Sequence, residues 1–100
     1  MARAFDGLTL ARLRSIPLWE ALEGLGLFVK QDQDFVPVKN ASTVRWWVSV
    51  DSMVYELLVT EEKWFDVREE KGGGGAIDLC MYLFDLEFVA AVKRLLKAGL

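Results

Sequence analysis

The chain has no histidine and only one cysteine, Cys80, among its 100 residues. The absence of histidine removes the commonest general base and the commonest metal ligand together. A single cysteine cannot form an internal disulfide, which fits a reducing cytoplasm. The sequence also has no nucleophile–base pair and no cluster of metal ligands. We therefore predict a cytoplasmic protein that is not an enzyme and has no cofactor.

Long apolar runs are missing as well. No stretch of about 18 uncharged apolar residues occurs, so we expect no membrane span. The N-terminal sequence MARAFDGLTLARLRS has arginines but lacks the apolar region of a signal peptide. Hydrophobic residues make up 53% of the chain, which is enough for the core of one domain without disulfides or metal.

The chain also lacks an excess of positive charge, because its formal net charge is −3. Residues 51–70 carry seven acidic and two basic side chains and are therefore at −5, whereas the other eighty residues are at +2. Any surface for nucleic acid should therefore lie away from residues 51–70. Four glutamates of this segment form either a solvated face or a contact surface for a basic partner: Glu61, Glu62, Glu69 and Glu70.

The periodicity of the apolar residues predicts a small α+β domain over residues 15–100, preceded by an N-terminal arm over residues 1–14. A short helix begins near Pro17, and a hairpin is expected over residues 27–38. Apolar and polar residues alternate over 43–50, and a second hairpin spans 52–67. Two helices close the chain, the second with Asp85 as its N-cap.

The glycine run Gly72, Gly73, Gly74 and Gly75 stands directly before the first of these helices. A phosphate-binding loop would need Lys and Ser or Thr after the last glycine, but Ala76 and Ile77 follow it. Asp78 in the first helical turn would also repel a phosphate. Two interpretations remain, a plain linker and a structural loop inherited from a metal-binding ancestor.

The segment GGGGAIDLCMYLFDLEFVAAVKRLL resembles the closing segment of the zinc-binding domain of bacterial DNA primases. In that family a glycine pair precedes AIDF, and a short break leads into a second helix. The positions that match it in order are Gly73, Gly74, Ala76, Ile77, Asp78, Leu79, Leu86, Phe88, Ala91, Val92 and Leu95. The resemblance extends more loosely to IPLWEALEGLGLFVKQDQDFVPV. It implies a zinc-ribbon-like antiparallel sheet flanked by an N-terminal helix and two C-terminal helices.

The family's metal ligands are not present in this chain. Its two ligand pairs fall on Val36 and Lys39 and on Val67 and Glu70, none of which forms a zinc ligand pair. The chain thus looks like a degenerate, metal-free relative of the kind found in primase-like proteins of mobile elements. Aromatic residues in the strands, such as Trp46 and Trp64, would then replace the metal clamp by burial.

The resemblance implies a non-catalytic module of DNA replication in a plasmid, phage or integrative element that contacts single-stranded or template DNA. Trp47, in opposite phase to Trp46, is the candidate for stacking on a base. The candidate phosphate contacts are Arg3, Arg12, Arg14, Lys93, Arg94 and Lys97. The alternative is a protein-interaction module whose acidic hairpin docks or inhibits a replication protein such as a primase, helicase or relaxase.

Overall fold

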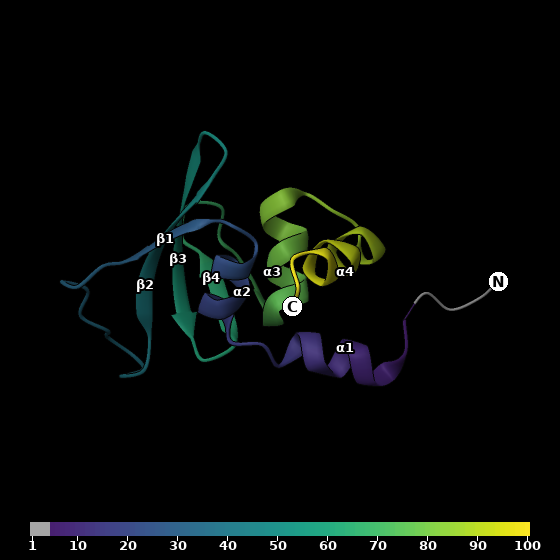
Figure 1. The fold of residues 1–100 in the computed structure, drawn as a ribbon. Helices are drawn as coiled ribbons and strands as arrows, with labels where there is room; N and C mark the ends of the chain where they lie inside the picture. The colour runs from purple at the N-terminus through teal and green to yellow at the C-terminus, as the bar shows by residue number, and fades with distance from the viewer. Residues whose placement is uncertain (1–4) are drawn as a thin grey trace.

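The computed structural model describes residues 5–100, which form four helices and a five-stranded antiparallel sheet (Figure 1). The helices are α1 (Gly7–Arg14), α2 (Leu18–Gly24), α3 (Gly75–Phe84) and α4 (Phe88–Lys97). The strands are β1 (Phe28–Gln31), β2 (Val44–Val50), β3 (Met53–Thr60), β4 (Lys63–Asp66) and β5 (Lys71–Gly74). The predicted α+β class, with one helix region before the sheet and two helices after it, is confirmed.

The sheet is a meander in which each strand pairs with the next one along the chain. Tight turns join its central strands, and the first turn residues, Asp51 and Glu61, have left-handed φ angles of 54° and 57°. The register places Trp46 opposite Leu57 and Val59 opposite Trp64. These residues therefore share one side of the sheet, because directly paired residues point to the same face.

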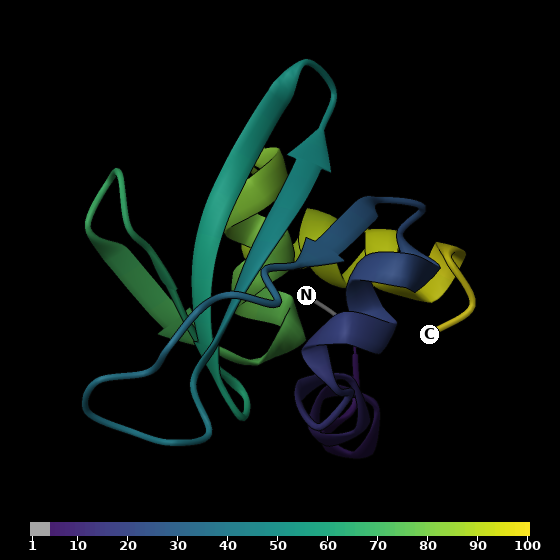
Figure 2. The same cartoon turned by 90° about the vertical axis from the view of Figure 1, so that its left-hand side faces the viewer.

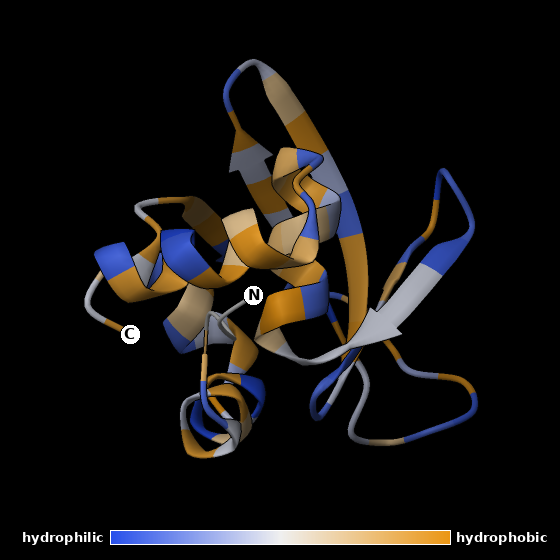
Figure 3. Ribbon diagram, turned by 90° about the vertical axis from the view of Figure 1, so that its right-hand side faces the viewer, coloured by the Kyte–Doolittle hydropathy of each residue, from blue (hydrophilic) through white to orange (hydrophobic). Residues whose placement is uncertain are grey.

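The core lies between this inner side of the sheet and the helices. Val48 and Leu57 from the sheet, Leu79 from α3 and Val92 from α4 are all at most 1% exposed. Figure 3 views the molecule from the helical side, where α4 alternates between hydrophilic and hydrophobic segments. Helix α4 is thus amphipathic, with Val92 and Leu95 buried and Lys93 exposed.

Within the arm that we predicted for residues 1–14, the described residues 5–14 pack against the rest of the domain. Residues 7–14 form helix α1, in which the carboxylate of Asp6 accepts a hydrogen bond of 2.7 Å from the Thr9 N–H. Leu13 is completely buried, and α1 contacts α3 and α4. This part of the segment therefore belongs to the core.

The predicted hairpin over residues 27–38 is wrong in its second limb. Its first limb is β1, which pairs with β2 so that Val29 lies opposite Val48. Residues 32–43 are a long loop, because Asp32 accepts a hydrogen bond from the Asp34 N–H and bends the chain. Pro37 has no N–H to donate to a ladder, which also disfavours a strand there.

Two further predictions about the C-terminal region need correction. The glycine run is not a loop, because Gly72–Gly74 lie in edge strand β5 and Gly75 opens α3 with a left-handed φ of 82°. Asp85 does not cap α4 but ends α3 in a left-handed conformation, with φ 53°, that Asp tolerates better than most residues. The N-cap of α4 is Glu87.

Candidate functional site

The outer side of the sheet, away from the core, faces the viewer in Figure 2. It carries several exposed aromatic and apolar side chains. Phe28 is 68% exposed, Val54 44% and Phe65 41%. Trp47 lies on the same side, since it pairs with Lys30 and Glu56 in the phase opposite to buried Trp46. We call this surface, with the loop 32–43 beside it, the outer sheet face.

Arg45 organises the middle of the outer sheet face. Its guanidinium binds the Asp32 carboxylate at 2.8 Å and the Glu56 carboxylate at 3.0 Å. It also lies 5.1 Å from the centre of the Phe35 ring and 5.6 Å from that of Trp47. Arg45 thereby ties the loop to β2 and β3 and engages both carboxylates near Trp47.

The electrostatics of this group follow from its hydrogen bonds. The pKa of Asp32 is lowered, first by the N–H of Asp34 and then by the bond with Arg45. The pKa of Arg45 is raised, chiefly by its bond with Asp32. Both groups therefore stay charged at neutral pH, and each partly cancels the other's charge.

A groove of about 560 Å³ runs between the loop and strands β3 and β4 on the same face. Its apolar walls come from Phe35, Val38, Leu58 and Phe65. Its polar lining comes from Lys39, Asn40, Thr43, Thr60 and Lys63. Apolar walls with two ammonium groups suit a flat aromatic group that carries negative charge.

The structure does not bring the predicted DNA-binding residues together. Trp47 lies on the outer sheet face, whereas Arg12 and Arg14 lie on α1 and Lys93, Arg94 and Lys97 on α4, behind the sheet. Three of these arginines have partners within the helical layer. Arg12 donates to the Leu100 carbonyl, Arg14 lies 5.9 Å from the centre of the Phe88 ring, and Arg94 lies 4.0 Å from that of Phe84. Arg3 lies outside the described residues.

The four glutamates of the predicted acidic surface also fall into two separate pairs. Glu61 and Glu62 form the turn before β4, and Glu69 and Glu70 belong to the turn after it. Four strand residues span about 13 Å, so the pairs occupy opposite ends of the strand. A single partner would have to contact both ends to use them all.

The predicted positions of lost zinc ligands do not face one another either. Lys39 lines the groove beside Lys63, at the start of β4, and Val36 lies in the same loop. Val67 and Glu70 follow the end of β4, where the Val67 N–H donates to the backbone carbonyl of Glu56. Within residues 5–100 there is no group of three or more side chains that could hold a metal ion.

The sequence reasoning missed most of the outer sheet face. Phe28, Lys30 and Phe65 were not selected, although they fall in the same phase as Trp47 once the strands are paired. The alternation within each strand was visible in the sequence. The pairing that aligns strands β1 to β4 was not visible in the sequence.

Three comparisons with known proteins add nothing to this description. No protein-family model, no curated protein and no solved structure matches this chain. Among the described residues, no helix has both the length and the apolar character needed to span a membrane.

Proposed function

We propose that the outer sheet face binds single-stranded DNA. The observation that carries this proposal is the combination, on one exposed face, of aromatic rings with lysines that make no ion pair in residues 5–100. Phe28, Trp47 and Phe65 provide the rings. Lys30 is paired with Trp47, and Lys63 lies two residues from Phe65 on the same side of β4. Unpaired bases stack on such rings without regard to sequence, while the ammonium groups attract the phosphates.

The outer sheet face offers two contact points for bases, two strands apart. One base stacks on Trp47, with Lys30 next to it on β1. A second base enters the groove against Phe35 and Phe65, where Lys39 and Lys63 reach its phosphate. Trp47 on β2 and Phe65 on β4 are two strands apart, which corresponds to about 10 Å.

The wider role follows from the resemblance of residues 73–95 to the primase zinc-binding domain. It supports a non-catalytic, metal-free module that contacts template DNA during replication of a mobile element. The chemistry of primer synthesis would then belong to another polypeptide or domain. A cytoplasmic location fits the single, buried Cys80, whose thiol pKa is raised by burial.

The alternative function is docking of a replication protein. Exposed apolar side chains beyond the sheet favour it, because Val36 is 77% exposed and Val38 94% exposed in the loop 32–43. In this alternative the acidic turns, with Glu61 and Glu62 at one end of β4 and Glu69 and Glu70 at the other, select a basic partner.

The test is fluorescence anisotropy with a labelled 12-residue oligothymidine at low salt. Trp47→Ala and Phe65→Ala should each weaken binding by about 1–3 kcal/mol, the usual contribution of one stacked base. Lys39→Gln with Lys63→Gln should reduce the slope of log affinity against log salt by about 1.4, since each lost phosphate contact contributes about 0.7. A matched double variant, Lys93→Gln with Lys97→Gln, changes the charge equally on α4 and should have no effect.

Failure of the wild-type chain to bind the oligonucleotide at low salt would refute DNA binding. Equal weakening by the α4 variant would instead place the DNA on the helical side. The alternative would be established by two results together. The wild type would not bind DNA, and changing the four glutamates at positions 61, 62, 69 and 70 to lysine would abolish its complex with a replication protein.

A further inference from the structure

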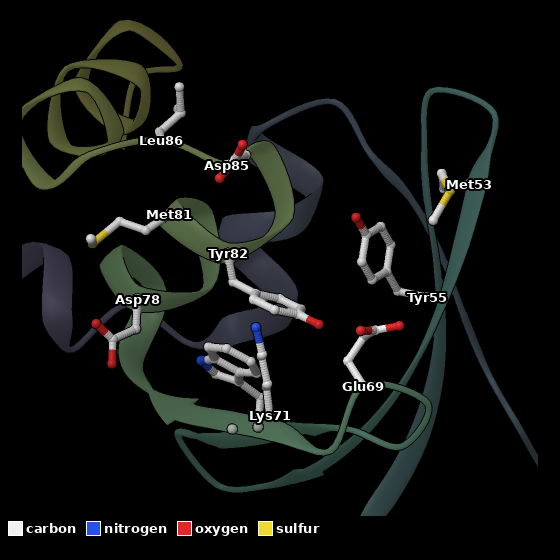
Figure 4. A pocket seen from close by; sticks show the side chains of 11 residues that line it. Met53, Tyr55, Glu69, Lys71, Asp78, Met81, Tyr82, Asp85 and Leu86 are labelled. Atoms are coloured by element: carbon white, nitrogen blue, oxygen red, sulfur yellow. The ribbon is translucent and has the colours of Figure 1, made fainter.

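A second hollow, of about 610 Å³, lies between α3 and the inner side of β3, β4 and β5 (Figure 4). Three aromatic side chains line it, and they contact one another. The ring centres of Tyr55 and Tyr82 are 6.0 Å apart at an interplanar angle of 71°, and those of Trp64 and Tyr82 are 5.0 Å apart at 32°. The negative faces of such rings attract an organic cation.

The charged groups around the hollow have an acidic excess. Three carboxylates line it, those of Glu69, Asp78 and Asp85, and the only basic side chain among the lining residues is that of Lys71. Figure 4 shows Lys71 extending from β5 toward the ring of Tyr82. The chain's own ammonium group thus points into the hollow, and the lining residues keep a formal charge of −2.

Trp64 adds an unused hydrogen-bond donor. Its side chain is almost fully buried, and its indole N–H has no partner in the described part of the chain. A Cβ atom placed on Gly73 would lie 3.1 Å from Cε2 of Trp64, which adjoins that N–H, and 3.0 Å from Oδ2 of Asp78. The donor therefore lies near a carboxylate of the hollow. A guanidinium has no acceptor atom for this N–H, so Trp64 offers an arginine ligand its ring and not its donor.

The edge of β5 is open at Gly72, next to the hollow, whereas the Gly74 N–H on the same edge donates to the Asp78 carboxylate at 3.3 Å. The Gly75 N–H donates to the Glu62 carbonyl, which makes Glu62 and Gly75 a hydrogen-bonded pair. Hydrogen-bonded and non-hydrogen-bonded pairs alternate along an antiparallel ladder, so Phe65 and Gly72 form a non-hydrogen-bonded pair. The N–H and C=O of Gly72 therefore point away from β4. No other strand of residues 5–100 pairs with β5 on that side. An unpaired edge of this kind accepts an extended peptide.

We infer that an extended peptide segment of a protein partner docks antiparallel to β5 and places an arginine side chain in the hollow. One peptide residue exchanges two backbone hydrogen bonds with Gly72. The preceding residue then lies opposite Gly73, and its side chain points to the inner side of the sheet. An arginine there enters the space beside Asp78, Trp64 and Tyr82, where carboxylates and rings both favour a guanidinium.

The probe is the peptide acetyl-Thr-Arg-Val-Thr-amide, with binding followed by calorimetry and by the NMR signal of the Trp64 indole N–H. The matched peptide with citrulline in place of arginine has the same shape without the charge and should bind about tenfold more weakly or worse. N-methylation of the valine removes one hydrogen bond with Gly72 and should also weaken binding. Arginine amide alone should bind more weakly than the full peptide.

Three variants of the protein test the charges. Glu69→Gln with Asp85→Asn should weaken the peptide complex about tenfold, because it removes two negative charges from the hollow. The fold should be kept, since Asn also tolerates the left-handed backbone at position 85. Lys71→Gln should strengthen it, because it removes the competing ammonium group. Glu61→Gln with Glu62→Gln makes the same change in net charge at the other end of β4 and should leave the affinity unchanged.

Equal affinity for the arginine and citrulline peptides would overturn the inference, as would equal weakening by the variant at positions 61 and 62. No binding to the Lys71→Gln variant would also refute it, since that variant has the most favourable hollow. Arginine amide binding as tightly as the peptide would exclude pairing with β5.

Discussion

Gly73 is restricted to glycine by its neighbour across the sheet. A Cβ atom at this position would lie 2.7 Å from Cζ2 of Trp64, which is itself buried and cannot retreat. Gly74, one residue later, has an ordinary extended φ of −141° and nothing nearer to such an atom than the Glu62 carbonyl at 3.9 Å. The space around Gly73 thus excludes a larger residue, whereas the space around Gly74 does not.

Gly73→Ala should therefore destabilise the fold by about 1–3 kcal/mol, the usual cost of overpacking, whereas Gly74→Ala should be close to neutral. Urea denaturation of both variants measures the difference. Equal midpoints for the two variants would contradict the close contact with Trp64.

Tyr82 is the second residue with a defined structural task. Its hydroxyl donates to the carboxylate of Asp66, which is 2% exposed and accepts further hydrogen bonds from the N–H groups of Arg68 and Glu69. Burial raises the pKa of Tyr82, and the bond with Asp66 acts in the same direction. The hydrogen bond from Tyr82 thus joins α3 to the last residue of β4.

A raised pKa means that the folded chain holds this proton more tightly than the unfolded chain. The stabilisation is therefore complete below the ordinary tyrosine pKa of about 10 and is lost as the pH rises above it. Between pH 10 and 12 the unfolding free energy of the wild type should fall more steeply than that of Tyr82→Phe, by at most about 1.4 kcal/mol per pH unit. Denaturant titrations at several pH values test this, and parallel curves for the two proteins would disprove it.

Among the elements, α1 depends strongly on tertiary contacts. It has eight residues, which is too short for a stable isolated helix, and its apolar residues do not form a continuous face. Its stability comes from the N-cap at Asp6 and from the burial of Leu13 against α3 and α4.

Leu13→Ala should destabilise the protein by about 2–5 kcal/mol, because it empties a fully buried position. Leu8→Ala, in the same helix at a position 85% exposed, is the matched control and should change the stability by less than about 0.5 kcal/mol. Similar small effects of both changes, measured by thermal unfolding, would show that α1 is dispensable.

At the scale of the whole molecule, the sheet separates two surfaces of different chemistry. The outer sheet face combines aromatic rings with Lys30, Lys39 and Lys63, and the hollow beside α3 combines rings with carboxylates. The two proposed ligands, DNA and an arginine-containing peptide, therefore need not compete for the same side chains.

Folding of the whole domain should not depend on metal. Burial of Trp46, Trp64 and the apolar residues of α3 supplies the core, and residues 5–100 offer no cluster of metal ligands. The melting temperature should therefore be unchanged by excess EDTA. A lower melting temperature in the chelator, or stoichiometric zinc by native mass spectrometry, would contradict this expectation.

The sequence by itself determined several of the local elements, but not β5 or the loop over residues 32–43. Alternation over residues 44–50 predicted β2, the acidic hairpin over 52–67 predicted β3 and β4, and helical spacing predicted α3 and α4. These elements can be predicted because the spacing of apolar side chains indicates which face of a helix or strand is buried, whatever element it packs against.

Tertiary structure alone decided which strands and surfaces meet. The glycine run became an edge strand by pairing with β4. At Gly73 the Trp64 ring fills the space that a side chain would need, and this contact joins residues nine positions apart. Pairing across four strands likewise aligned Phe28, Trp47 and Phe65 on one face, while the basic residues of α1 and α4 were left behind the sheet. The choice of strand partners depends on the packing of the whole core, which no local pattern in the sequence records.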